Sequence, residues 1–283
     1  MRYLLLGAAA IALSGCSFLG LGGHSDYAQY NANTGYHGTH SQTQVATNRG
    51  GCQTGQCLAR WNIEGGIGPS FVAGGTAVTA DNTHSLPNTA INEIKMKDVY
   101  DTGWRAELGG SYALSPNRKV TAMGFIDEAD SAGPQNWGTV NGQQLTGALS
   151  DYNSYGAEIG LRQYFAPRNG IILKSVRPYV EGRLGATHVD DIRIQDTQLG
   201  GAVFSAADVP FYESGWAGSA AGLVGVETPI ARYATIGLET GVRYTQGPKS
   251  DNSAIAADSP LAGSNNGASR TTIPVMLRGR YRF

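Results

Sequence analysis

Two short segments of the sequence combine the residue types that acyl-transfer enzymes use. The first segment holds Asp81, His84 and Ser85, and the second holds His188, Asp190 and Asp191. A histidine that takes the proton of a serine hydroxyl, and is itself oriented by a carboxylate, is a general arrangement for nucleophilic catalysis. Adjacency in sequence is weak evidence for it, because side chains on loops are rarely held in catalytic geometry. We therefore interpret both segments as solvated loop residues and predict no enzyme.

The two cysteines of "CQTGQC" are of the residue type that forms disulfides and binds metal ions. Cys52 and Cys57 form an even pair, which predicts a disulfide in an oxidising compartment. The alternative is a metal site that adds His37 and His40 of "HGTH". That spacing matches no established zinc pattern, and the disulfide remains the preferred interpretation.

The charges of the chain exclude one class of partner. The formal net charge is −1, which gives no basic surface for nucleic acid, so no nucleic-acid partner is predicted. The segment "VDDIRIQD" brings together Asp190, Asp191 and Asp196, whose oxygens are of the kind that calcium binds. Clustered carboxylates in a loop are usually only solvated, and we predict neither a metal nor a cofactor.

The N-terminal segment "MRYLLLGAAAIALSGC" resembles the signal peptide of a bacterial lipoprotein. Arg2 precedes an apolar run that is too short to cross a bilayer as a helix. The run ends in "LSGC", whose last residue is Cys16. The resemblance implies cleavage before Cys16 and acylation of its thiol by diacylglycerol, with palmitate among the acyl groups. Ser17, in place of Asp, implies sorting to the outer membrane. An ordinary signal peptide with an incidental cysteine is the alternative.

The residues that follow the signal differ in composition from the rest of the chain. Residues 16–59 are rich in Gly, Asn, Gln, Ser and Thr and have few aliphatic side chains. Such a segment cannot bury enough apolar surface to fold alone, so we predict a lipidated flexible tether. The predicted organisation is a signal peptide at 1–15, the tether at 16–59 and one barrel domain at 60–283.

Eight segments of the barrel domain have the character of β-strands. They are 60–71, 100–114, 119–127, 153–165, 175–188, 213–227, 232–245 and 271–283. Three connections are short turns, and the other four, at 72–99, 128–152, 189–212 and 246–270, are long and polar. Short turns at one end and long loops at the other are typical of transmembrane β-barrels.

The segment "VRPYVEGRLGAT", residues 176–187, shows how the two faces of a strand differ. Side chains alternate between the faces of a strand. One face carries Val180 and Leu184, and the other carries Glu181 and Arg183. In a soluble sandwich the charged face would be outside. In a membrane barrel the apolar face meets lipid and the polar face lines the interior, and we predict this second arrangement.

The same alternation in the other strands predicts one lumenal charge network. An eight-stranded barrel is just wide enough for side chains to fill it, and buried charges must be paired. The sixth strand, "WAGSAAGLVGVE", has weak alternation, and the phase of the third, "VTAMGFI", is ambiguous. The predicted network consists of Glu64, Arg105, Glu107, Glu158, Arg162, Glu181, Arg183, Glu239, Arg243, Arg278 and Arg280.

Aromatic residues lie near both ends of the apolar faces. The predicted rim at the short turns holds Trp61, Tyr112, Phe165 and Tyr281, and the rim at the long loops holds Phe71, Trp104, Tyr155, Trp216 and Tyr244. Ten residues at a rise of ~3.4 Å and a tilt of ~40° span ~26 Å, close to the ~25 Å apolar band of a membrane barrel. Two aromatic belts on the outer face are not expected of a soluble calyx.

This pattern resembles the OmpA-type eight-stranded outer-membrane β-barrels, which include small porin-like surface proteins of alphaproteobacteria. The resemblance covers residues 60–283 and includes the C-terminal "MLRGRYRF", in which Leu277, Tyr281 and Phe283 alternate. It implies an all-β transmembrane barrel surrounded by outer-membrane lipid and lipopolysaccharide. It also implies recognition of the strand that ends at Phe283 by the barrel assembly machinery. The chain departs from the family in its lipoprotein signal and in having no peptidoglycan-binding domain after the barrel.

Three functions are compatible with these features. The first is a lipid-anchored outer-membrane barrel with a structural role, a surface-interaction role, or a role in docking to another envelope or surface protein. The second is a lipid A-modifying barrel enzyme. The resemblance suggests it because some eight-stranded barrels modify lipid A with a histidine near the outer rim. The third is a narrow pore of low conductance, although water-filled porins need about sixteen strands. We favour the first.

Overall fold

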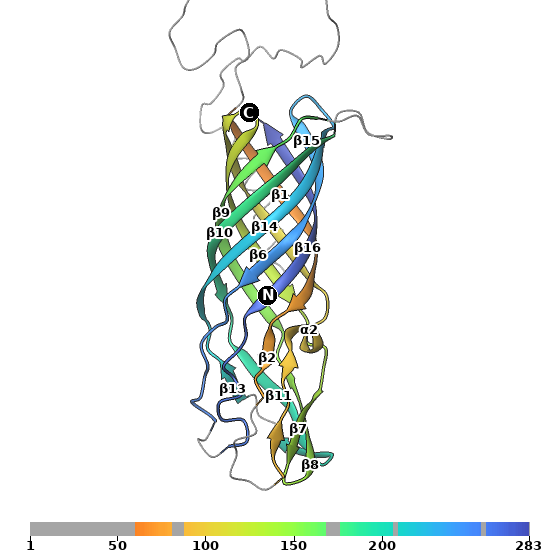
Figure 1. Cartoon of the computed structure of the whole chain (residues 1–283), viewed down its shortest axis with the longest axis vertical. Helices are drawn as coiled ribbons and strands as arrows, with labels where there is room; N and C mark the ends of the chain where they lie inside the picture. The colour runs from red at the N-terminus through yellow and green to blue at the C-terminus, as the bar shows by residue number, and fades with distance from the viewer. Residues whose placement is uncertain (1–59, 81–87, 168–175, 206–208, 256–258, 283) are drawn as a thin grey trace, which may run out of the picture. The chain divides into compact units, whose positions relative to one another are not determined.

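The part of the chain that the structure describes is a closed β-barrel that carries a smaller β-structure at one end (Figure 1). The computed structural model describes residues 60–80, 88–167, 176–205, 209–255 and 259–282. Eight antiparallel strands close the barrel, so the all-β, eight-stranded fold predicted from the sequence is confirmed.

The eight barrel strands contain 12 to 15 residues each. They are β1 (Trp61–Gly74), β5 (Gly103–Ser115), β6 (Arg118–Ala129), β9 (Tyr152–Tyr164), β10 (Arg177–Val189), β14 (Gly215–Pro229), β15 (Ala234–Thr245) and β16 (Arg270–Arg282). Barrel strands that are consecutive in the sequence are hydrogen-bonded neighbours in the barrel, and β1 pairs with β16 to close it. A tilted strand needs about 9–11 residues to cross a bilayer, so each strand exceeds that length.

The alternation in β10 explains why this strand fits a barrel wall. Glu181 and Arg183 are buried, whereas Val180 and Leu184 are exposed. The charged face therefore lines the interior and the apolar face forms the exterior. Pro178 lies in the second position of β10, before pairing with β9 begins at Tyr179, and the register with β14 continues past it without a shift.

The structure resolves the ambiguous phase of β6. Met123 and Phe125 point into the barrel, where they are 2% and 6% exposed, and the small residues Ala122 and Gly124 lie outside. The guanidinium carbon of Arg105 lies 3.7 Å from the centre of the Phe125 ring, so an apolar ring here supports an inward charge. Apolar side chains on the inner face and small ones on the outer face remove the usual contrast between the faces.

The four long connections are not the polar loops expected from the sequence. Their described residues, which include the helical turn α2 (Met96–Val99), form a folded unit that we call the cap, at 75–80, 88–102, 130–151, 190–205, 209–214, 246–255 and 259–269. Its strands are β2 (Thr76–Val78), β3 (Ala90–Ile91), β4 (Ile94–Lys95), β7 (Gln135–Val140), β8 (Gln143–Leu149), β11 (Ile192–Leu199), β12 (Ala202–Ser205) and β13 (Val209–Tyr212). One sheet has the order β12-β11-β8-β7-β3, with β13 also paired to β11, and β2 pairs with β4.

The cap has an apolar core of its own. Trp137 and Phe211 are fully buried, and their ring centroids lie 5.9 Å apart. Tyr212 is also buried and donates a hydrogen bond of 2.7 Å to the carbonyl oxygen of Ala77, which joins connections far apart in sequence. The core continues into the ends of barrel strands through residues such as Tyr152. The cap is therefore a packed structure mounted on the barrel.

The junction between β1 and β2 requires a glycine. Gly75 has a φ of +112°, and a Cβ at this position would overlap the carbonyl oxygen of Ser269. Only glycine combines this backbone conformation with so close an approach of another chain segment. The cap therefore departs from the barrel wall at a residue that allows a sharp change of direction.

Candidate functional site

The interior of the barrel is filled by charged side chains. All eleven residues of the predicted lumenal network are buried, each at most 6% exposed. The structure adds four more buried charges, so the interior holds eight Lys and Arg side chains and seven Asp and Glu side chains among the described residues. Because these charges nearly balance, each can be compensated within the barrel.

Glu107 accepts contacts from four arginines. Its Oε1 lies 2.6 Å from Nη2 of Arg243 and 2.8 Å from Nε of Arg105. Its Oε2 lies 2.8 Å from Nη1 of Arg183 and also contacts Arg278. One carboxylate therefore links guanidinium groups from β5, β10, β15 and β16. This arrangement connects strands on opposite sides of the barrel.

Arginines on β9 and β10 join further carboxylates to this group. Arg162 contacts Glu64 at 2.8 Å and Glu181 at 2.6 Å. Glu181 in turn contacts Nε of Arg183 at 2.6 Å. Arg243 also contacts Glu158 at 2.5 Å, and Arg278 contacts Glu239 at 2.8 Å. The last residue of the predicted set, Arg280, contacts Glu227 at 2.6 Å, and Glu227 lies outside that set.

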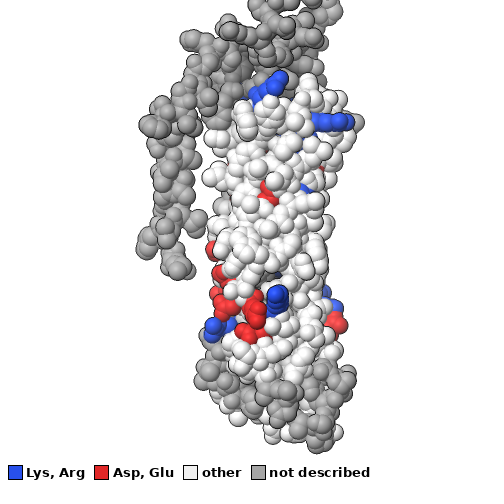
Figure 2. All heavy atoms as spheres, turned by 90° about the vertical axis from the view of Figure 1, so that its left-hand side faces the viewer, with Lys and Arg blue, Asp and Glu red and all other residues white. Residues whose placement is uncertain are grey.

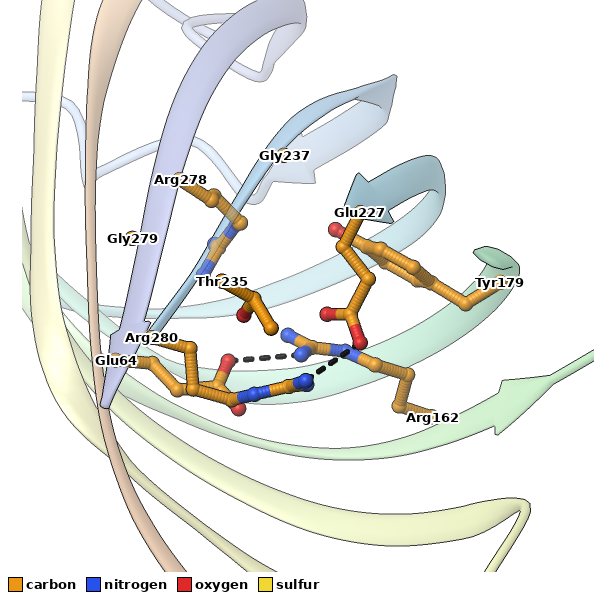
Figure 3. A pocket seen from close by; sticks show the side chains of 9 residues that line it. All are labelled: Glu64, Arg162, Tyr179, Glu227, Thr235, Gly237, Arg278, Gly279 and Arg280. Atoms are coloured by element: carbon orange, nitrogen blue, oxygen red, sulfur yellow. Dashed lines mark hydrogen bonds and ion pairs between the residues drawn. The ribbon is translucent and has the colours of Figure 1, made fainter. Parts of the chain in front are cut away.

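A small cavity remains near the short-turn end of this network (Figure 3). Glu64, Arg162, Glu227 and Arg280 surround it, with Tyr179 behind them. Its volume is about 10 Å³, which is close to the space that a single water molecule occupies. The side chains therefore leave no room here for a solute larger than water.

Sequence reasoning missed four lumenal charges. Lys119 and Asp127 lie on β6, whose phase was ambiguous, and Glu227 lies on β14, where small residues blur the alternation. Arg270 begins β16 one residue before the predicted strand. The contacts of Asp127 with Arg270 at 2.7 Å and with Ser70 Oγ at 3.3 Å lie beyond the core of the network. In the structure, Asp127 lies opposite Arg105 of β5 and Lys119 lies opposite Ala113, but the sequence alone does not give this register.

The outer wall of the barrel is apolar over its whole circumference. Leu184 on β10 is 71% exposed, and Ile159 on the neighbouring β9 is 67% exposed. Exposed apolar side chains of this size occur on each barrel strand except β6: Trp61, Ile63, Ile67, Phe71, Leu108, Leu114, Tyr155, Ile159, Leu161, Val180, Leu184, Trp216, Val224, Val226, Leu238, Val242, Tyr244, Ile273, Val275, Leu277 and Tyr281. A continuous apolar exterior of this extent is not expected of a soluble monomer.

Aromatic side chains pair at both rims of this wall. At the short-turn rim, the ring centroids of Trp61 and Tyr112 lie 4.8 Å apart. At the cap rim, those of Tyr155 and Trp216 lie 5.9 Å apart. Tyrosine and tryptophan favour the boundary between apolar and aqueous surroundings, because their rings are amphipathic.

His188 occupies the cap rim between these aromatic rings. Its imidazole stacks on Tyr155 with centroids 4.9 Å apart and meets Trp216 edge-on at 5.4 Å. Its Nδ1 lies 3.6 Å from Asp190 and makes no hydrogen bond within the described part of the chain. Asp191 contacts Arg193 at 2.5 Å instead. The structure therefore shows a ring-stacked histidine without the hydrogen-bonded carboxylate of a catalytic triad.

Within the described ranges, no group of three or more His, Cys, Asp and Glu side chains is arranged to hold a metal ion. Asp190, Asp191 and Asp196 accordingly form no such group. Several predicted residues lie outside the described residues: Cys16, His37, His40, Cys52, Cys57, Asp81, His84, Ser85 and Phe283. In the described part of the chain, no helix has the length and apolar character needed to cross a membrane.

Burial also fixes the protonation of tyrosines in the cap. Removal from water raises the pKa of Tyr212 well above its ordinary value, because the phenolate would lose its solvation. The pKa of Tyr100 is raised for the same reason. Both phenols therefore stay protonated at any physiological pH, and Tyr212 remains the donor of its hydrogen bond to Ala77.

Comparison with known proteins gives structural likenesses only. No protein-family model matches the chain, and no curated protein does so either. The alignment with the Neisserial surface protein A covers 80% of this chain and 98% of that protein's chain, at 10% identity and a TM-score of 0.38. Ail, the attachment invasion locus protein of Yersinia pestis, covers 79% with 99% of its own, at 16% identity and a TM-score of 0.34. The outer membrane protease OmpT of Escherichia coli covers 79% with 97% of its own, at 9% identity and a TM-score of 0.41. All three TM-scores lie below 0.5, so the fold rests on the chain's own strand pairing.

Proposed function

We propose that this chain is a bacterial outer-membrane β-barrel that holds its cap at the cell surface. The observation that carries the proposal is the division of most barrel strands into a charged inner face and an apolar outer face, as in Glu181 and Leu184 of β10. An apolar exterior around a polar interior is the arrangement that a lipid bilayer requires of a barrel. In a closed barrel, the backbone N–H and C=O groups of each strand are paired with those of the neighbouring strands. No unpaired backbone group therefore faces the lipid.

The orientation follows from the lengths of the connections. In outer-membrane barrels, short turns face the periplasm and longer connections face outward. The cap lies on the long-connection side, and the chain enters β1 and leaves β16 on the other side. A tether at 16–59 acylated at Cys16 would then reach the inner leaflet. An intact-mass measurement of the mature chain tests that anchor, and a chain without acyl mass contradicts it.

The role that this geometry supports best is a structural and surface-interaction role, which includes docking to another envelope or surface protein. The lumen is closed by ion pairs, whereas the part outside the wall is a packed sheet rather than a set of loops. A rigid sheet presents the same surface continuously, so a partner that binds it need not order flexible loops first. We therefore assign recognition to the cap and support to the barrel.

Labelling of single cysteines on intact cells tests the exposure of the cap. Gln143→Cys lies at the exposed start of β8, directly after the turn from β7, and Asn117→Cys lies in the exposed turn between β5 and β6. A maleimide that cannot cross membranes should label the first variant on intact cells and the second only after permeabilisation. The unsubstituted chain gives the background from native cysteines. Selective labelling of position 117 would reverse the orientation and remove the cap from the surface.

A lipid A-modifying activity has one observation in its favour. His188 lies on the outer face at the cap rim, where its ring could approach the headgroup of an outer-leaflet lipid. Its nearest carboxylate, on Asp190, stands 3.6 Å from Nδ1 and is itself exposed. We infer that the chain is not an enzyme, and unchanged lipid A masses in cells that express the chain and its His188→Ala variant are the expected result. A mass change that depends on His188 would contradict this.

A further inference from the structure

In the part of the chain that the structure describes, the short-turn end of the barrel carries arginines and no exposed carboxylate side chain. Among the described residues, its exposed and half-exposed charges are Arg60, Arg118, Arg177, Arg232 and Arg282, which we call the basic rim. Glu227 is the nearest acidic side chain, but it is buried and contacts Arg280 at 2.6 Å. In Figure 2, basic side chains lie at the upper end of the visible wall, above a broad band in which few charged atoms are visible.

The opposite end has the reverse balance. Eleven exposed or half-exposed acidic side chains belong to the cap or its junction with the wall: Glu93, Asp98, Asp101, Glu128, Asp130, Asp151, Asp190, Asp191, Asp196, Glu213 and Asp251. The basic side chains of this end, within the same described ranges, are Lys95, Lys97, Arg193 and Lys249. Figure 2 shows acidic side chains crowded below the band with few charged atoms. Although the net charge of the chain is only −1, the two ends of the barrel therefore carry opposite charges.

Tyrosine side chains contact two arginines of the basic rim at the edge of the apolar wall. Nη1 of Arg60 donates a hydrogen bond of 2.9 Å to the Tyr112 hydroxyl. The guanidinium carbon of Arg232 lies 5.4 Å from the centre of the Tyr233 ring. Tyrosines at this position mark the level of the lipid headgroups, so the guanidinium groups beside them lie at the same level.

We propose that the basic rim binds the headgroups of anionic phospholipids in the leaflet that surrounds the short-turn end. The proposal rests on the proposed function, since it requires that the barrel span a bilayer. Guanidinium groups bind phosphate oxygens through paired, charge-assisted hydrogen bonds. The rim is continuous with the apolar wall, so a lipid can place its acyl chains on the wall and its phosphate against an arginine. A zwitterionic lipid would bring a cationic group to a rim that has no exposed carboxylate side chain to receive it.

The number of arginines sets the size of the expected preference. A basic side chain near an anionic membrane surface contributes roughly five-fold to association. Replacing three arginines of the rim should therefore reduce the preference for an anionic over a zwitterionic lipid roughly five-fold at each of the three positions at low salt. Because the interaction is electrostatic and exposed, added salt should weaken it in the unsubstituted chain as well.

The test compares two triple variants of the full mature chain in nanodiscs of phosphatidylcholine with a minority of phosphatidylglycerol. The rim variant is Arg60→Gln, Arg118→Gln and Arg232→Gln, and the control is Lys95→Gln, Lys97→Gln and Lys249→Gln on the cap. Both lower the net charge by the same amount, and all six residues are exposed. Native mass spectrometry counts the lipids of each type that remain bound. We expect the rim variant to lose its enrichment in phosphatidylglycerol and the control to retain it.

Two results would overturn the proposal. One is an unsubstituted chain without enrichment in phosphatidylglycerol. The other is an equal loss in both variants, which would make the effect one of net charge rather than of the rim. Protease protection of the wall, measured in the same nanodiscs, separates these results from a failure of the proposed function. A chain that does not insert contradicts the membrane assignment and this proposal together, whereas an inserted chain without lipid preference contradicts only the proposal.

Discussion

Glu107 is the residue on which the lumenal network depends most. Four guanidinium groups, from Arg105, Arg183, Arg243 and Arg278, contact its carboxylate, and its own side chain is fully buried. Glu107→Gln keeps the size of the side chain and removes the negative charge. Breaking a buried charge pair on one side typically costs about 3–5 kcal/mol, because the opposite charge remains in the interior without compensation. We expect a decrease of this size in the free energy of unfolding.

Urea unfolding in lipid vesicles measures this decrease. Glu213→Gln is the matched control, because Glu213 is exposed at the base of the cap and a substitution there should change the free energy of unfolding by less than about 0.5 kcal/mol. Equal stabilities of the two variants would show that the carboxylate of Glu107 does not hold the arginines together.

Most residues of this network can be identified from the sequence, because successive side chains of a strand point alternately to its two faces. Glu181 and Arg183 could be placed inside from β10 alone, since Val180 and Leu184 mark the other face. Parity could not give the partners, because the contact of Arg183 with Glu107 joins residues 76 positions apart across the lumen. Asp127 was missed because its own strand carries Met123 and Phe125 on the inner face.

At the scale of the elements, the cap behaves as a unit with its own core. Trp137 on β7 is 0% exposed, and its ring contacts Phe211 and lies against Gly147. Trp137→Ala removes a large buried side chain, which typically costs about 3–5 kcal/mol. We expect the cap to become sensitive to protease while the barrel keeps the gel mobility of a folded barrel in an unheated sample.

Leu277→Ala is the control for this experiment, because Leu277 is half-exposed on the outer wall and has no place in the cap core. Its cap should resist protease as the unsubstituted cap does. An uncleaved cap in the Trp137→Ala variant would show that the apolar core does not maintain the sheet. Loss of the barrel mobility in that variant would show that cap and wall unfold together.

The barrel strands could be located from the sequence, but the cap could not, and the reason is physical. Each barrel strand is long, and its period of two repeats several times, so the observed limits agree with the predicted ones to within three residues. The cap strands contain as few as 2 residues, and several of their pairings include register shifts. The cap core also collects Ala77, Trp137, Phe211 and Ile255 from four separate connections. No local sequence pattern indicates a core that is assembled from four separate connections. The sequence of each connection therefore predicts a polar loop.

At the scale of the whole molecule, three zones follow one another along the barrel: a basic rim, an apolar wall around a charged interior, and an acidic cap. The wall requires lipid, because its exposed apolar side chains have no other cover in the described structure. The interior requires ion pairing, because an eight-stranded barrel has little space for water. These three zones are the ones expected of the membrane scaffold that we propose.

The measurement that tests the membrane assignment most directly is the effect of one charge on the wall and the same charge on the cap. Leu184, in the middle of β10, is 71% exposed, and Val203 on β12 is 70% exposed. Urea unfolding in lipid vesicles should show that Leu184→Arg lowers the free energy of unfolding by about 2–4 kcal/mol, the cost of an arginine near the bilayer midplane. Val203→Arg, which places the same charge in water, should change it by less than about 0.5 kcal/mol. Two substitutions with equally small effects would mean that Leu184 faces water, and the chain would not be a transmembrane barrel.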